Sequence, residues 1–83
     1  MPQQTPHILD ALGGKDNIRQ VAACLTRLRV LLQDNTKLNK QALIEAGAID
    51  VIQVGETYQI IFGKKAELYR DALIELLNAT QQA

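Results

Sequence analysis

The sequence predicts an α+β fold, a two-layer sandwich in which a four-stranded antiparallel sheet carries three helices on one face. Three observations lead to this prediction. The chain has 83 residues, enough for one small hydrophobic core. Its residues are 47% hydrophobic and 22% charged, as in ordinary globular proteins. Its patterns run in the order helix, two strands, helix, two strands, helix, and each strand pair is joined closely enough to be antiparallel.

A short helix is expected near the start of the chain. Thr5-Pro6 supplies an N-cap and a proline at the first helical position, and Gly13-Gly14 allows the left-handed backbone that ends a helix. The only histidine, His7, falls in the first turn. It is a candidate phosphate acceptor or metal ligand, but no second ligand is spaced to help it, so a solvated residue is the preferred interpretation.

Two strands follow, separated by a bend at Cys24-Leu25. The first covers residues 17–23. The second, over residues 26–32, alternates apolar residues with Arg27 and Arg29, the period-two pattern of a half-buried strand. Both arginines are therefore expected on the same face, with side chains about 7 Å apart along the strand, a spacing suited to one phosphate.

The C-terminal half supplies a helix and a hairpin. Asn39 can cap a helix over residues 40–46, which a glycine terminates. Strands over residues 49–54 and 58–62 then flank a three-residue connection at residues 55–57 that contains glycine. These two strands complete the expected sheet.

The longest helix is expected over residues 64–79 and should be the main cover of the sheet. Tyr69 is a candidate stacking platform for a ligand, but an aromatic residue on a stripe of leucines is usually part of the core. The residues at helical spacing on that stripe are Ala66, Tyr69, Leu73, Leu76 and Leu77. We expect a single domain over residues 7–80, between a flexible leader over residues 1–6 and a frayed tail over residues 81–83.

Charge and cysteine content restrict the class of function. Nine basic and nine acidic residues cancel, which argues against general nucleic-acid binding. The single cysteine cannot form an internal disulfide, and the start of the chain lacks a secretory signal pattern, so a cytoplasmic location is expected. No window approaches the roughly 18 consecutive apolar residues that cross a bilayer. We therefore expect no direct membrane insertion.

The candidate site is the segment from Cys24 to Arg29, which sets the cysteine beside the hydroxyl of Thr26 and the guanidinium groups of Arg27 and Arg29. Fixed positive charges favour the thiolate form of a nearby thiol. Guanidinium groups also hold phosphoryl oxygens through forked donors. The alternative, a small buried cysteine beside solubilising arginines, is not excluded by spacing alone.

Two other catalytic classes fit badly. A cysteine phosphatase places its arginine farther along the chain from the cysteine than Arg27 and Arg29 are from Cys24, and it needs an aspartate as general acid. A dithiol redox motif needs a second cysteine close by, but the chain contains a single cysteine.

The stretch CLTRLR at residues 24–29 closely resembles the phosphorylation-site motif of the enzyme IIB domain of the bacterial phosphoenolpyruvate-dependent sugar phosphotransferase system, glucose and N-acetylglucosamine class. Further matches are LGGKDNI at residues 12–18, GA at residues 47–48, and QIIFG at residues 59–63 followed by Lys65. The resemblance spans residues 8–78, and it implies a four-stranded antiparallel sheet with three helices on one face.

The resemblance also implies a function, that of a protein-cysteine-phosphate sugar phosphotransferase component. Cys24 would accept a phosphoryl group from a phosphohistidine of a IIA partner and pass it to a sugar bound by a IIC membrane permease. Thr26, Arg27 and Arg29 would bind the phosphate. No cofactor or metal is implied, and a cytoplasmic domain would act at the inner face of the membrane through IIC.

Two further expectations concern partners. Because the surface around Cys24 must admit two proteins in succession, Leu25 is the leading candidate for an apolar partner contact. The competing interpretation is a sensor module that binds a transcriptional regulator or other protein according to its phosphorylation state. That function would need the same cysteine, so the motif does not discriminate between the two.

Overall fold

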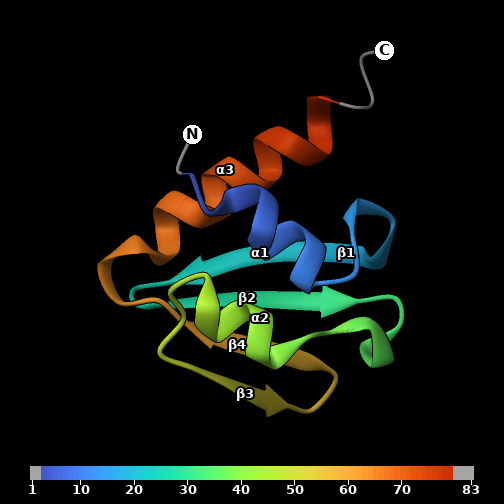
Figure 1. Cartoon of the computed structure of the whole chain (residues 1–83), viewed down its shortest axis with the longest axis horizontal. Coiled ribbons are helices and arrows are strands. Elements are labelled where there is room, and N and C mark those ends of the chain that lie inside the picture. Colours follow the sequence, from blue (N-terminus) through green and yellow to red (C-terminus); the bar gives the residue numbers. More distant parts are fainter. Residues whose placement is uncertain (1–2, 80–83) are drawn as a thin grey trace.

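In residues 3–79, the part that the computed structural model describes, three α-helices lie on one face of a four-stranded antiparallel sheet (Figure 1). This confirms the predicted α+β sandwich and its element order. The elements are α1 (Thr5–Ala11), β1 (Ile18–Cys24), β2 (Arg27–Leu32), α2 (Lys40–Glu45), β3 (Asp50–Val54), β4 (Thr57–Ile61) and α3 (Ala66–Ala79). Three short 3₁₀ turns join them: η1 (Lys15–Asn17), η2 (Asn35–Lys37) and η3 (Gly63–Lys65).

The strands are ordered β1-β2-β4-β3, so the two hairpins of the chain meet through β2 and β4. Side chains alternate between the two faces of each strand. Leu28 and Val30 of β2 and Ile60 of β4 are fully buried under the helices, whereas Arg27 and Arg29 are exposed on the opposite face. We call this opposite face, which none of α1–α3 covers, the open face of the sheet (Figure 1).

The first helix begins earlier than expected. Thr5 is the first residue of α1 and is fully buried on the same side of the helix as Ile8, one turn on, rather than serving as a side-chain cap. The leader predicted over residues 1–6 is therefore wrong at its C-terminal end. Residues 1–2 of that leader and the predicted tail over residues 81–83 lie outside the described residues.

A buried amide ties together the end of the molecule remote from Cys24. Asn17, expected to open the first strand, lies instead in η1, where its Nδ2 donates to the carbonyl oxygens of Leu12 (2.8 Å) and Asp34 (3.0 Å). Its Oδ1 accepts from the backbone N–H of Asp34 at 2.8 Å. Gly13 must be glycine here, since its φ is +97° and a Cβ would lie 2.6 Å from Asn17 Nδ2.

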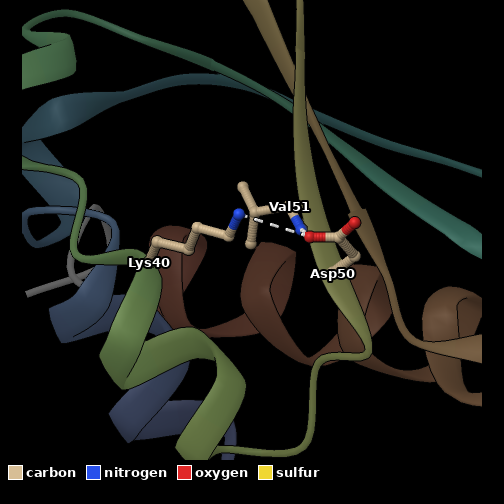
Figure 2. A network of polar contacts seen from close by, with 3 residues as sticks. All are labelled: Lys40, Asp50 and Val51. Carbon is tan, nitrogen blue, oxygen red and sulfur yellow. Dashed lines mark hydrogen bonds and ion pairs between the residues drawn. The ribbon is translucent and has the colours of Figure 1, made fainter.

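The second helix is capped as predicted, because Asn39 Oδ1 accepts from the backbone N–H of Ala42 at 3.1 Å. Lys40 then joins α2 to the sheet through an ion pair with Asp50 at 3.4 Å (Figure 2). The carboxylate of Asp50 also accepts from the backbone N–H of Val51 at 2.8 Å. The pKa of Asp50 is lowered mainly by this hydrogen bond from Val51, and to a smaller extent by Lys40.

The hairpin β3–β4 is tighter than expected. Its strands are joined by the two residues Gly55-Glu56, because Thr57 already pairs with Val54 in the ladder. The predicted core role of Tyr69 in α3 is confirmed. Its side chain is 4% exposed and its ring centroid lies 4.7 Å from that of Phe62.

Candidate functional site at the β1–β2 hairpin

Cys24 is the last residue of β1 and not part of a bend. It is exposed, and its cross-strand partner is Arg27, the first residue of β2. Directly opposed residues of an antiparallel pair project from the same face, so both side chains belong to the open face. Arg29 follows two positions along β2 on that face, opposite Ala22. The predicted common direction of the two arginines is thus confirmed, and the buried-cysteine alternative is excluded.

The loop between the two strands is unusual in its first residue. Leu25 has a φ of +56°, in the left-handed region, and it is the only non-glycine residue with a positive φ among residues 3–79. For a leucine this conformation costs about 1–2 kcal/mol. The side chain is 79% exposed, so the conformation projects an apolar group into solvent beside Cys24.

The second loop residue anchors the hairpin to the rest of the fold. The carbonyl oxygen of Thr26 accepts from the backbone N–H groups of Phe62 (3.0 Å) and Gly63 (3.1 Å), where β4 ends and η3 begins. In Figure 1 the turn between β1 and β2 accordingly lies beside the start of α3. Two main-chain hydrogen bonds therefore hold the loop, and with it the position of Cys24.

One residue of the site was missed by the sequence analysis. Arg27 Nη1 donates to Gln59 Oε1 at 2.6 Å, across from β2 to β4. Gln59 is the direct cross-strand partner of Arg29 and is therefore diagonal to Arg27. It belongs to the stretch QIIFG, but only the pairing register of β2 with β4 reveals its place beside both arginines.

The positive charges of Arg27 and Arg29 are not neutralised by a carboxylate among residues 3–79. The ion pairs among residues 3–79 are Lys40–Asp50 and Arg70–Asp71, and neither includes Arg27 or Arg29. The acceptor that Arg27 contacts, an amide oxygen, is uncharged. A negatively charged group arriving at the open face would thus meet cationic donors that are not already neutralised.

Cys24 lines neither of two hollows on the surface. A hollow of about 330 Å³ lies between α1 and α2, with His7 at its wall, and one of about 310 Å³ lies at the far end of β2. His7 is exposed, in agreement with its interpretation as a solvated residue. The cysteine thus stands on an open surface, which suits a macromolecular partner better than an enclosed small substrate.

Two absences hold for the described part of the chain. Residues 3–79 contain no group of three or more histidine, cysteine, aspartate or glutamate side chains arranged to hold a metal ion. Within the same range, no helix has the length and apolar character required to span a bilayer.

The fold and the hairpin together define an open-faced α+β domain with an exposed cysteine and two arginines on its open face, neither of which forms an ion pair within residues 3–79. Residues 7–39 match the family model described as phosphotransferase system, EIIB.

One relative in sequence is the glucose-specific EIICBA component of the phosphotransferase system of Staphylococcus carnosus, 41% identical over 71 residues. The alignment covers 86% of this chain and 10% of that protein, so the chain spans about a tenth of the relative's length. A solved domain of the phosphotransferase system IIabc component from Clostridium difficile matches with a TM-score of 0.76 and 26% identity. That match covers 90% of this chain and 79% of the other. Together, the family-model match and these two relatives show that the chain belongs to the EIIB family, as its sequence motif indicated.

Proposed function

We propose that this chain is a phosphoryl carrier of a sugar phosphotransferase system, with Cys24 as the residue that is phosphorylated. In the first transfer the Cys24 thiolate attacks the phosphorus of a phosphohistidine on a IIA partner, so that an S–P bond forms while the P–N bond breaks. In the second, a hydroxyl of a sugar held by a IIC membrane partner attacks the same phosphorus. The P–S bond then breaks, the sugar phosphate leaves, and the thiolate is regenerated.

The observation that carries the proposal is the exposed Cys24 directly opposite Arg27 on the face of the sheet that α1, α2 and α3 leave uncovered. A relay between two proteins needs a nucleophile that each of them can reach in turn. Phosphoryl transfer passes through a loose transition state with charge on the peripheral oxygens, so positioned cations stabilise it. Arg27 and Arg29 lie on the same face and are free of ion pairs with other residues of the range 3–79.

The remaining site residues take roles that follow from their places. Thr26 joins the two arginines in binding the phosphoryl group, since it directly precedes Arg27 and its backbone is fixed by the bonds to residues 62 and 63. Leu25 contacts the partner proteins with its exposed apolar side chain. The chain would work at the inner face of the membrane, where the IIC partner binds the sugar.

Mass spectrometry tests the proposal. The chain is incubated with phosphoenolpyruvate, the general phosphotransferase proteins and a IIA partner, and is analysed under conditions that preserve an S–P bond. We expect the intact mass to rise by one phosphoryl group, located on Cys24 by fragmentation. Glucose is the first sugar to test for the second transfer, since the S. carnosus relative is named as glucose-specific. A chain that remains unlabelled with an active donor would overturn the proposal.

A further inference from the structure

The contact between Arg27 and Gln59 lies within the open face. Arg27 Nη1 donates to Gln59 Oε1 at 2.6 Å, and Gln59 has Arg29 as its direct cross-strand partner on β2 and Ile52 on β3. The amide group therefore lies beside both arginines on the same face. It comes from β4, a strand to which the sequence motif around Cys24 does not extend.

The chemistry of this acceptor differs from that of a carboxylate. A guanidinium group has five N–H donors, and the bond to Gln59 uses one nitrogen of Arg27, so donors remain for phosphoryl oxygens. The amide oxygen is neutral and leaves the positive charge uncompensated. A glutamate at this place would form an ion pair with Arg27 and compete with an incoming phosphate.

The bond also acts on the entropy of binding. An arginine side chain has several rotatable bonds and loses conformational freedom when a ligand fixes it. If the guanidinium is already held by Gln59, less freedom is lost when the phosphoryl group arrives, and binding is stronger by that amount. Orienting the cation without neutralising it requires an uncharged acceptor on the neighbouring strand, and Gln59 is such an acceptor.

We propose that Gln59 is a positioning residue for phosphoryl transfer, which orients Arg27 on the open face before the phosphate arrives while leaving its charge available. This inference rests on the proposed function, because it assigns to Gln59 an effect on the same transfer to Cys24. Gln59 acts through Arg27 and is not itself the nucleophile. Its substitution should consequently alter the rate of transfer far more than the stability of the fold.

Two variants separate orientation from charge. Gln59→Met keeps the length of the side chain but removes the acceptor, and Gln59→Glu replaces the neutral acceptor by a charged one. The single-turnover rate of transfer from phosphorylated IIA to Cys24 is measured at saturating donor. We expect a fall of about tenfold for Gln59→Met, the size of one lost hydrogen bond to a charged group, and a larger fall for Gln59→Glu.

The matched control is Gln20→Glu. Gln20 lies on β1 with its side chain on the open face, opposite Leu31 and away from the hairpin, so the variant adds the same charge to the same face. We expect the parent rate for this variant. Denaturation midpoints close to that of the parent would show that all three variants fold.

A double-mutant cycle tests whether Gln59 acts through Arg27. In an Arg27→Lys background the fork that Gln59 orients is absent, so Gln59→Met should cause little further loss of rate. An undiminished loss in that background would overturn the assignment, as would equal slowing by Gln59→Glu and Gln20→Glu. If the parent protein is phosphorylated and the Gln59 variants react at the parent rate, this inference alone is overturned. If the parent protein is not phosphorylated at all, the proposed function is overturned together with it.

Discussion

The two hairpins of the sheet have the same loop length but different chemistry. Both loops contain two residues, and the first of these has a positive φ in each, +56° for Leu25 and +62° for Gly55. Glycine adopts this conformation without steric cost, and two-residue hairpins favour it at that position. Leucine adopts it at a cost of about 1–2 kcal/mol. The hairpin β3–β4 thus follows the local rule that β1–β2 breaks.

The difference indicates where the fold sacrifices stability. The residues that flank the two loops differ in chemistry. The β1–β2 loop lies between Cys24 and Arg27, and the β3–β4 loop lies between Val54 and Thr57. Residues in sparsely populated backbone regions cluster at functional sites, where surrounding bonds maintain them. Here the hydrogen bonds to the carbonyl of Thr26 supply that support. The strained hairpin carries Cys24 and both arginines of the candidate site, whereas the relaxed hairpin contributes Gln59 from the middle of β4.

The largest expected difference between the hairpins is chemical. Cys24→Ser should abolish phosphoryl labelling, because a serine hydroxyl is protonated at neutral pH and is a far weaker nucleophile than a thiolate. Val54→Ser at the equivalent place of the other hairpin should leave labelling unchanged. Both are measured by mass spectrometry with the complete donor system. Labelling of the serine variant at the parent rate would remove Cys24 from its role.

The next effect concerns the residue after each loop. Arg27→Lys keeps the charge but loses the planar fork, so we expect transfer to slow by about tenfold or more. Arg19→Lys is the matched control, since Arg19 is an exposed arginine near the other end of β1. Single-turnover rates with phosphorylated IIA decide the matter. Equal rates for Arg27→Lys and the parent would contradict bidentate binding.

A smaller effect is expected on partner affinity. Leu25→Glu should weaken binding of IIA by about tenfold, because an apolar contact is replaced by a charge that must be desolvated. Val54→Glu makes the same change on the other hairpin, where Val54 is 50% exposed, and should bind as the parent does. Calorimetric titration measures both. Unchanged affinity of the Leu25 variant would refute the contact.

The loops should also differ in what they contribute to stability. Leu25→Gly should raise the free energy of unfolding by about 0.5–1 kcal/mol, the released strain less the extra entropy of glycine in the unfolded chain. Gly55→Leu should lower it by about 0.5–1 kcal/mol, the backbone strain less the smaller entropy of leucine in the unfolded chain. A Cβ at Gly55 meets no atom within 4 Å, so no clash contributes. Urea denaturation of both variants measures these changes. If both substitutions changed the free energy of unfolding in the same direction, the proposed difference between the loops would be wrong.

The smallest expected effect is that of acid, and it involves one carboxylate near each hairpin. Hydrogen bonds from the side chain and the backbone N–H of Thr36 lower the pKa of Asp34, which follows β2, and the bond from Val51 lowers that of Asp50, which opens β3. A depressed folded pKa gives stability that is present above the unfolded value of about 3.9 and is lost as pH falls through the folded pKa.

Denaturation curves should therefore shift to lower midpoints as the pH falls below about 4. Asp34→Asn and Asp50→Asn should each flatten this dependence. A variant that retains the full acid sensitivity of the parent would show that its carboxylate does not contribute.

Much of the fold was predictable because it depends on patterns that are local in sequence. The alternation in β2 fixed the inward residues and the exposed arginines, and the side chain of Asn39 marked the start of α2. The buried role of Tyr69 followed from the helical stripe of α3. Propensity, periodicity and capping all act within a few residues.

The parts that were not predicted depend on contacts between distant segments. The role of Asn17 requires the backbone of Asp34, and that of Gln59 requires the pairing of β4 with β2. The positive φ of Leu25 contradicts the preference of its residue type, so no pattern of propensity could have indicated it. For the candidate site, the sequence therefore indicated Cys24 and the two arginines, but not Gln59, which contacts Arg27.

The bonds that residues 62 and 63 make to the carbonyl of Thr26 also determine when the site becomes complete during synthesis. A nascent chain that has left the ribosome only as far as β3 already contains Cys24 and both arginines but lacks these two donors and the amide of Gln59. Such non-local contacts form late because their loop-closure entropy must be overcome first. The assembled site therefore requires β4 docked beside β2, and a chain without β4 lacks the geometry described above.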